Sequence, residues 1–99
     1  MKIKEMQERI YQNKVNKGFN ITNIEQEFCY LYGEVGEAYD AYHKEKPDLG
    51  EELADIAIYL MGLSEILNID LEKEIIHKIE KNEKRIYKKI DGDIIKIEG

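Results

Sequence analysis

Apolar residues recur every three or four positions along most of this chain, which is the spacing that lets a helix bury one face. The first such segment covers residues 3–16 and stops at residues 17–20, Lys-Gly-Phe-Asn, which favour a turn. Thr22 followed by Glu25 is a capping-box pattern, so a second helix is expected over about residues 23–44.

The middle of the chain predicts a third helix with an unusually broad apolar surface. Asp48 with Glu51 repeats the capping pattern directly after a proline, and the helix should cover about residues 49–67. Ile58 and Met61 lie outside its main apolar stripe. This helix is therefore expected to be central or to form an interface between copies of the chain.

The last third of the chain predicts one more helix and a turn. Asp70 is placed as the N-cap of a fourth helix, which should continue to about Lys89. Asp91-Gly92 is a turn signal next to the isoleucine-rich residues 94–97, which predicts a short terminal strand or hairpin.

Length and composition fit one globular domain. The chain has 99 residues, of which 42% are hydrophobic, and it shows no repeat, linker or low-complexity tract. We therefore expect an all-α fold, a four-helix bundle with a short C-terminal strand or hairpin, forming a single domain over residues 1–99 with its core at about residues 22–90.

Two pairs of carboxylates stand out against this helical background. Glu34 and Glu37 are three residues apart, as are Glu52 and Asp55, so each pair lies on one side of its helix. Glu34 and Glu52 each lie roughly 80° from the centre of their helix's apolar stripe, and their partners roughly 140° in the same sense. Packed antiparallel along these stripes, the two helices would turn all four acids into one cleft.

Four acids beside buried segments cost solvation energy unless a cation neutralises them, and hard divalent cations prefer carboxylate oxygens. The pattern therefore predicts a magnesium site at Glu34, Glu37, Glu52 and Asp55, against the competing interpretation of two solvated helix faces.

The fourth helix carries a basic row. Lys78, Asn82 and Arg85 are spaced four and three residues apart beside its apolar stripe. Two cations around an amide suit a polyphosphate chain, because arginine grips phosphate oxygens with two parallel hydrogen bonds.

A second metal site must be weighed. Asp40-x-x-His43 and Glu74-x-x-His77 are similar to the inward pairs of di-iron bundles. Both histidines, however, lie roughly 100° or more from the apolar stripe of their helix, so they are expected on the surface.

Charge and cysteine content limit the binding partners and the cellular location that we expect for this protein. A net charge of −6 argues against a nucleic-acid partner. The longest uncharged stretch, residues 56–64, is too short to cross a bilayer, and the first residues contain no apolar leader. Cys29 is the only cysteine, which excludes an intrachain disulfide and favours a reducing compartment, so a cytoplasmic protein is expected.

The combination of motifs resembles the MazG-like all-α nucleoside triphosphate pyrophosphohydrolases. Gly33-Glu-Val-Gly-Glu37, then Glu51-Glu-Leu-Ala-Asp55, then Lys78-Ile-Glu-Lys-Asn82-Glu-Lys-Arg85 follow the family order of two acid pairs and a Lys…Asn…Arg helix. The resemblance covers about residues 28–87. Many members have a glutamate where this chain has Gly33, and a glycine there is similar to the dCTP-pyrophosphatase branch.

The resemblance implies hydrolysis of a nucleoside or deoxynucleoside triphosphate between the α and β phosphates, giving a monophosphate and pyrophosphate. It implies that the acid quartet holds Mg²⁺, with Mn²⁺ as a possible substitute, and that a water aided by Glu37 attacks the α-phosphorus. It further implies phosphate binding by the basic row, base contacts by Tyr59 and Phe19, and assembly as a homodimer or homotetramer.

Two rival interpretations stay open at this stage. The chain is either a catalyst of this kind or a non-catalytic helical module of the same fold that acts through protein partners. A pyrophosphatase acting on another nucleotide derivative is the second rival, because base preference depends on a pocket shape that the residues do not reveal.

Overall fold

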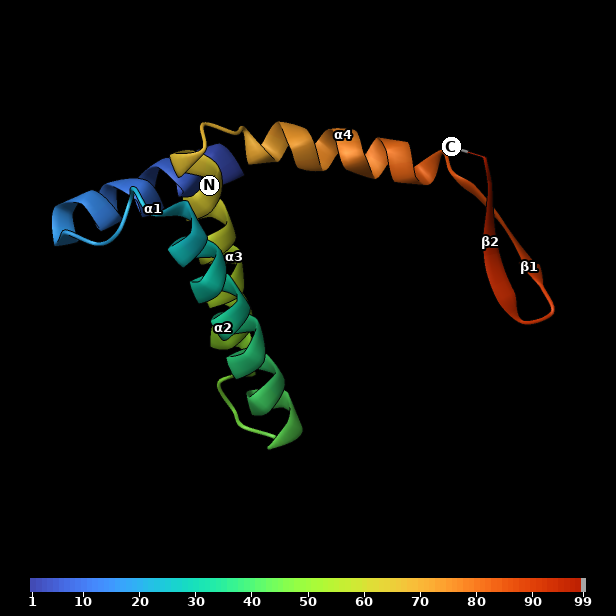
Figure 1. The fold of residues 1–99 in the computed structure, drawn as a ribbon, viewed down its shortest axis with the longest axis horizontal. Coiled ribbons are helices and arrows are strands. Elements are labelled where there is room, and N and C mark those ends of the chain that lie inside the picture. The colour runs from blue at the N-terminus through green and yellow to red at the C-terminus, as the bar shows by residue number, and fades with distance from the viewer. Residues whose placement is uncertain (99) are drawn as a thin grey trace.

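Four helices and one β-hairpin make up the computed structural model, which describes residues 1–98 (Figure 1). Gly99, the last residue of the predicted domain, lies outside the described residues. The all-α class and the terminal hairpin are confirmed. The elements are α1 (Ile3–Lys17), α2 (Ile24–His43), α3 (Leu49–Ile66), α4 (Leu71–Glu83), β1 (Ile86–Ile90) and β2 (Asp93–Glu98).

Side-chain caps begin two of the helices. Asp70 caps α4 as predicted, accepting a hydrogen bond from the backbone N–H of Lys73 at 3.2 Å. The cap of α2 is Asn23, which accepts from the Gln26 N–H at 3.0 Å, so the Thr22 capping-box expectation is off by one residue.

The fourth helix ends earlier than its periodicity suggested. It stops at Glu83 rather than near Lys89, and residues 86–90 pair antiparallel with residues 93–98. Asp91 and Gly92 both have positive φ, 50° and 86°, which is the geometry of a tight hairpin turn. Pairing between isoleucine-rich strands across this turn therefore outcompetes further helix.

α2 and α3 run antiparallel and pack along their length, while α1 crosses α3 near its end (Figure 1). The core residues lie at these contacts: Ala38 and Ala41 on α2, and Leu63 on α3, are at most 5% exposed. Gly62 lets the crossing helices approach, since a Cβ there would lie 3.2 Å from Ile10 Cγ2.

α4 and the hairpin form one limb, which extends away from a second limb made of α2 and α3, while α1 reaches to the side opposite α4 (Figure 1). The radius of gyration is 17.0 Å, whereas a compact chain of this length would have about 13 Å. Many large apolar side chains are consequently exposed on both limbs. None of the described helices combines the length and apolarity needed to cross a membrane.

Candidate functional site

Three of the four predicted acids meet between α2 and α3. Glu34 and Glu37 project from α2 and Glu52 from α3, and one carboxylate oxygen of each lies within 4.8 Å of the others. The antiparallel pairing of the two helices produces this meeting, because it sets the middle of α2 opposite the first turns of α3. We call these three side chains the acidic cluster.

Asp55 lies just outside this cluster. It follows Glu52 by one turn of α3, and its charge is close enough to raise the pKa of both Glu34 and Glu52. It therefore flanks the cluster and contributes to its negative field.

Burial and mutual repulsion disfavour the charged forms of two carboxylates in the acidic cluster. Burial is the main cause that raises the pKa of Glu34 above its ordinary 4.5, followed by repulsion from Glu37 and Asp55. Burial also raises the pKa of Glu52, with repulsion from Glu37 and Asp48 adding to it. Glu34 Oε2 and Glu52 Oε2 are buried without a hydrogen-bond partner among the described residues. Such oxygens lack the compensation that buried polar groups normally have.

Asp48 is a further acidic residue of this region that the sequence pattern assigned only to capping. It sits at the N-cap position of α3, yet its side chain makes no capping hydrogen bond. Its Oδ1 is buried and has no hydrogen-bond partner within residues 1–98, and its charge raises the pKa of Glu52. The spacing of four residues between Asp48 and Glu52 was the available signal.

These donors fit a hard divalent cation. The cluster offers carboxylate oxygens from two helices, and two of those oxygens are buried and uncompensated, which is the chemistry that Mg²⁺ or Mn²⁺ satisfies. The histidines of the alternative di-iron pairs are exposed, and His43 stacks on Tyr39 with ring centroids 5.9 Å apart. Within residues 1–98, the group of converging ligands contains carboxylates alone.

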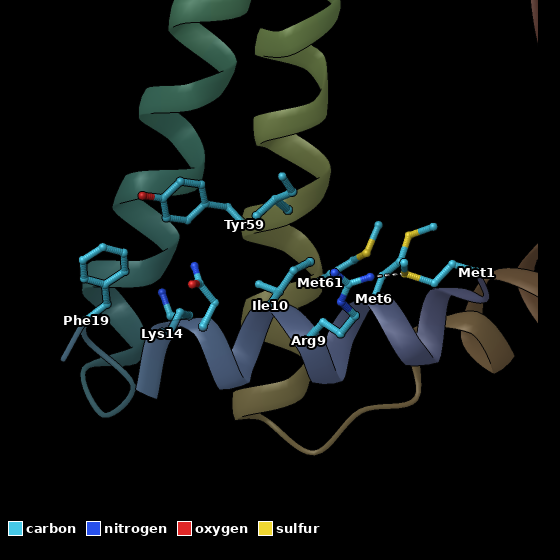
Figure 2. Close-up of a pocket in the computed structure, with 11 residues that line it drawn as sticks. Met1, Met6, Arg9, Ile10, Lys14, Phe19, Tyr59 and Met61 are labelled. Carbon is cyan, nitrogen blue, oxygen red and sulfur yellow. Dashed lines mark hydrogen bonds between the residues drawn. The ribbon is translucent and has the colours of Figure 1, made fainter. Parts of the chain in front are cut away.

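A cavity of about 650 Å³ opens between α1 and α3, and its lining residues do not include the acidic cluster (Figure 2). Phe19 and Tyr59, the two predicted base-binding residues, both line it, together with Arg9, Asn13 and Lys14. The Tyr59 hydroxyl has a raised pKa, mainly because it is buried and next because Glu34 is near. Tyr59 therefore connects the cavity to the acidic cluster.

Lys14, one of the residues that line this cavity, belongs to a buried ion pair. Lys14 of α1 binds Glu27 of α2, whose side chain is only 1% exposed, and Asn20 Nδ2 donates to the second Glu27 oxygen at 3.0 Å. Lys14 Nζ also lies 5.6 Å from the centroid of the Tyr59 ring, a cation–π distance. Sequence reasoning missed this pair, because thirteen residues and a helix break separate its members.

The basic row is not brought to the acids within one chain. Lys78 and Asn82 lie on α4, and Arg85 follows its end, on the limb that points away from α2 and α3 (Figure 1). The charge of Arg85 is the main cause that lowers the pKa of Lys78, followed by burial and by the nearby Lys81 and Lys96. The row is therefore a concentration of positive charge, and the Arg85 Nε is buried without a partner among the described residues.

The fold is therefore that of an all-α protein in which an antiparallel helical pair gathers carboxylates that have no compensating partner among the described residues. The sequence model of the MazG nucleotide pyrophosphohydrolase domain matches residues 22–89. The chain belongs to this family, and its class is accordingly nucleotide pyrophosphohydrolase, with a nucleotide as substrate. Searches of curated proteins and of solved structures returned no match.

Proposed function

We propose that the protein hydrolyses a nucleoside or deoxynucleoside triphosphate between the α and β phosphates, releasing a nucleoside monophosphate and pyrophosphate in a Mg²⁺-dependent reaction. The observation that carries this proposal is the meeting of Glu34, Glu37 and Glu52, whose oxygens converge from two helices. One oxygen each of Glu34 and Glu52 is buried without a hydrogen-bond partner among the described residues. The family assignment supplies the nucleotide class of the substrate.

Glu34 and Glu52 are the residues best suited to hold the cation, with Glu37 and Asp55 completing the ligand set. Their buried oxygens have no hydrogen-bond partner in the described part of the chain, so cation binding relieves the repulsion between the carboxylates. A bound divalent cation would neutralise phosphate oxygens and acidify water at the site.

Glu37 is the residue proposed to accept the proton of the attacking water. It is the exposed member of the acidic cluster, whereas Glu34 and Glu52 are half-buried. A carboxylate that reaches solvent can take a proton from water and release it after the reaction.

The cavity beside Tyr59 is proposed to receive the base. Phe19 and Tyr59 provide aromatic faces for stacking, and Asn13 provides an amide that can hydrogen-bond a base edge. The volume of about 650 Å³ is in the range of small-molecule sites. The basic row of Lys78, Asn82 and Arg85 is proposed to bind the phosphates and to stabilise charge on the leaving pyrophosphate.

The functional unit is proposed to be a homodimer or a homotetramer. Leu53 and Ile58 on α3, and Ile76 and Ile79 on α4, are 43–54% exposed in one chain. Removing apolar area from water is favourable by about 25 cal/mol per Å², so contact with a second copy of the chain would stabilise the assembly. Light scattering at micromolar concentration should give at least twice the 11.7 kDa mass of the chain.

The decisive experiment is a product analysis over a panel of nucleoside and deoxynucleoside triphosphates and other nucleotide derivatives with Mg²⁺. Monophosphate and pyrophosphate in equal amounts support the proposal. Release of nucleoside diphosphate and inorganic phosphate would show that cleavage occurs between the β and γ phosphates instead. A chain that releases nothing from any nucleotide would instead be the non-catalytic helical module.

A further inference from the structure

A groove of about 610 Å³ opens between α2 and α3 and shares two residues with the acidic cluster. We call it the glycine groove, because two glycines of α2 form part of its lining. The lining includes Gly33, Gly36, Glu37, Asp40, Lys46 and Glu52. The groove therefore adjoins carboxylates to which the proposed function assigns the divalent cation.

Open space surrounds the two glycines in the described part of the chain. Apart from the neighbouring residues and the backbone of the same helix, no atom would lie within 4 Å of a Cβ at Gly33 or Gly36. Close packing therefore does not require glycine at either position, and glycine inside a helix is less stable than alanine. The absence of two side chains leaves the groove open to a ligand.

Lys46 brings a positive charge to this groove from the loop between the two helices. Its backbone N–H donates to the Ala41 carbonyl oxygen at 2.8 Å, and Ala41 is only 2% exposed. Pro47 follows directly and disfavours helical backbone at the residue before it. The loop is thus anchored at Lys46, which reduces the conformational entropy that ligand binding would cost.

The charge of Lys46 reaches the acidic cluster. Burial and three neighbouring carboxylates raise the pKa of Glu52, whereas Lys46 lowers it. Lys46 belongs to the limb that carries the acids, while the basic row lies on the other limb (Figure 1). The acids and at least one cation therefore come from the same limb of one chain.

Lys46 can change its partner at little cost. Its Nζ lies 3.4 Å from Asp40 Oδ2 and its side chain is 48% exposed, so this ion pair is weak. Lys44 Nζ lies closer to the same carboxylate, 3.0 Å from Asp40 Oδ1. If Lys46 turns to a ligand in the groove, Lys44 still compensates the charge of Asp40.

We propose that the glycine groove binds the two terminal phosphates of the substrate and that Lys46 donates hydrogen bonds to their oxygens. An ammonium group offers three donors and is a common ligand of phosphate. The carboxylates of Glu37, Asp40 and Glu52 outnumber it, so the groove should accept pyrophosphate only together with a divalent cation. The inference rests on the proposed function, because that proposal supplies the cation and the triphosphate.

Binding of inorganic pyrophosphate tests the groove without turnover. Calorimetric titration in the presence of Mg²⁺ compares the wild type with Lys46→Met, which keeps a side chain of similar length and removes its charge. The dissociation constant is expected to rise about tenfold or more, because hydrogen bonds from a charged donor are lost. Lys44→Met is the matched control, since Lys44 pairs with the same Asp40 and is not part of the groove lining. It should bind pyrophosphate as the wild type does.

A nucleoside monophosphate is the second titrant. It lacks the terminal phosphates, so its affinity should be the same for the wild type and Lys46→Met. Equal losses for both titrants would overturn the inference, as would unchanged pyrophosphate binding in Lys46→Met. Wild-type binding of pyrophosphate that is absent with Mg²⁺, or equally strong in EDTA, would overturn it as well. A wild type that binds pyrophosphate as expected but releases none from any triphosphate overturns the proposed function instead.

Filling the groove provides an independent test. Gly36→Leu adds a side chain where the groove is open, and Gly50→Leu adds the same side chain at an exposed position of α3 that is not part of the lining. Leucine favours helix over glycine, so both variants should melt at or above the wild-type temperature. Gly36→Leu should weaken pyrophosphate binding about tenfold, whereas Gly50→Leu should leave it unchanged. Wild-type affinity in Gly36→Leu would overturn the inference.

Discussion

Glu34 and Glu52 lie on different helices, yet they bring carboxylate oxygens within 4.8 Å of each other, and each buries one oxygen without a hydrogen-bond partner among the described residues. Two like charges held in this way favour any event that neutralises one of them. Protonation and cation binding are the two such events, and both are measurable.

Removing one acid should abolish turnover without harming the fold. Glu52→Gln is expected to lower pyrophosphate release by ~10²-fold or more, because a cation ligand and its charge are lost together. The melting temperature without metal should hold or rise, since repulsion with Glu34 and Glu37 is relieved. Glu51→Gln, an exposed neighbour, is the control and should retain activity. Near-normal turnover of Glu52→Gln would remove the basis for the metal site.

The metal-free protein should lose stability as pH rises. Burial raises the pKa of Glu34 and Glu52 above 4.5, so the folded state binds these two protons more tightly than the unfolded state. Their contribution is therefore favourable below about pH 4.5 and is lost as pH increases through the raised pKa values. Melting in EDTA, compared between wild type and Glu52→Gln, should show a steeper decline for the wild type. Parallel curves would contradict this coupling.

Mg²⁺ should raise the melting temperature, and more strongly near pH 8 than near pH 5. The reason is that cation and protons compete for the same carboxylates. The measurement is a melting series over millimolar Mg²⁺ at both pH values, with Glu52→Gln as the control that responds weakly. Ca²⁺ should bind as well and support little turnover, because it accepts a looser geometry. A melting temperature that ignores Mg²⁺ at pH 8 would count against the site.

Breaking the buried ion pair should cost far more stability than breaking an exposed one. Lys14→Met leaves Glu27 charged with its side chain only 1% exposed, and is expected to lower the unfolding free energy by about 3–5 kcal/mol. The matched exposed pair is Asp40 with Lys44, whose side chains are 45% and 59% exposed, and Asp40→Asn should cost far less, because solvent screens this pair. Urea unfolding measures both. Similar losses for the two variants would show that the interior pair is not a buried one in solution.

Phe19→Ala should weaken substrate binding with little effect on the chemical step. Stacking of a base on an aromatic ring contributes about 1–3 kcal/mol, so KM is expected to rise about tenfold while kcat changes little. Steady-state kinetics separates the two parameters. Phe19→Tyr keeps the ring and is the control. An unchanged KM in Phe19→Ala would place the base elsewhere.

The sequence by itself determined the helices, the N-cap at Asp70 and the hairpin turn at residues 91–92, because each of these depends on residues close along the chain. It also determined that Glu34 and Glu37 share a helix side, and that the two acid pairs lie at equal angles from their apolar stripes. The end of α4 was placed too late, since pairing of the strands is a competing interaction that helical periodicity does not register.

Only the tertiary structure decided which side chains meet across helices. The convergence of Glu52 with the α2 acids, the role of Asp48 beside them and the Lys14–Glu27 pair all depend on how the helices are packed. The direction of α4 depends on hydrogen bonds of the Gln7 side chain with the backbone of Ile69 and Leu71, which are more than sixty residues away in sequence. Spacing along one helix shows which face a residue occupies, whereas the partner of that face is set by contacts distant in the chain.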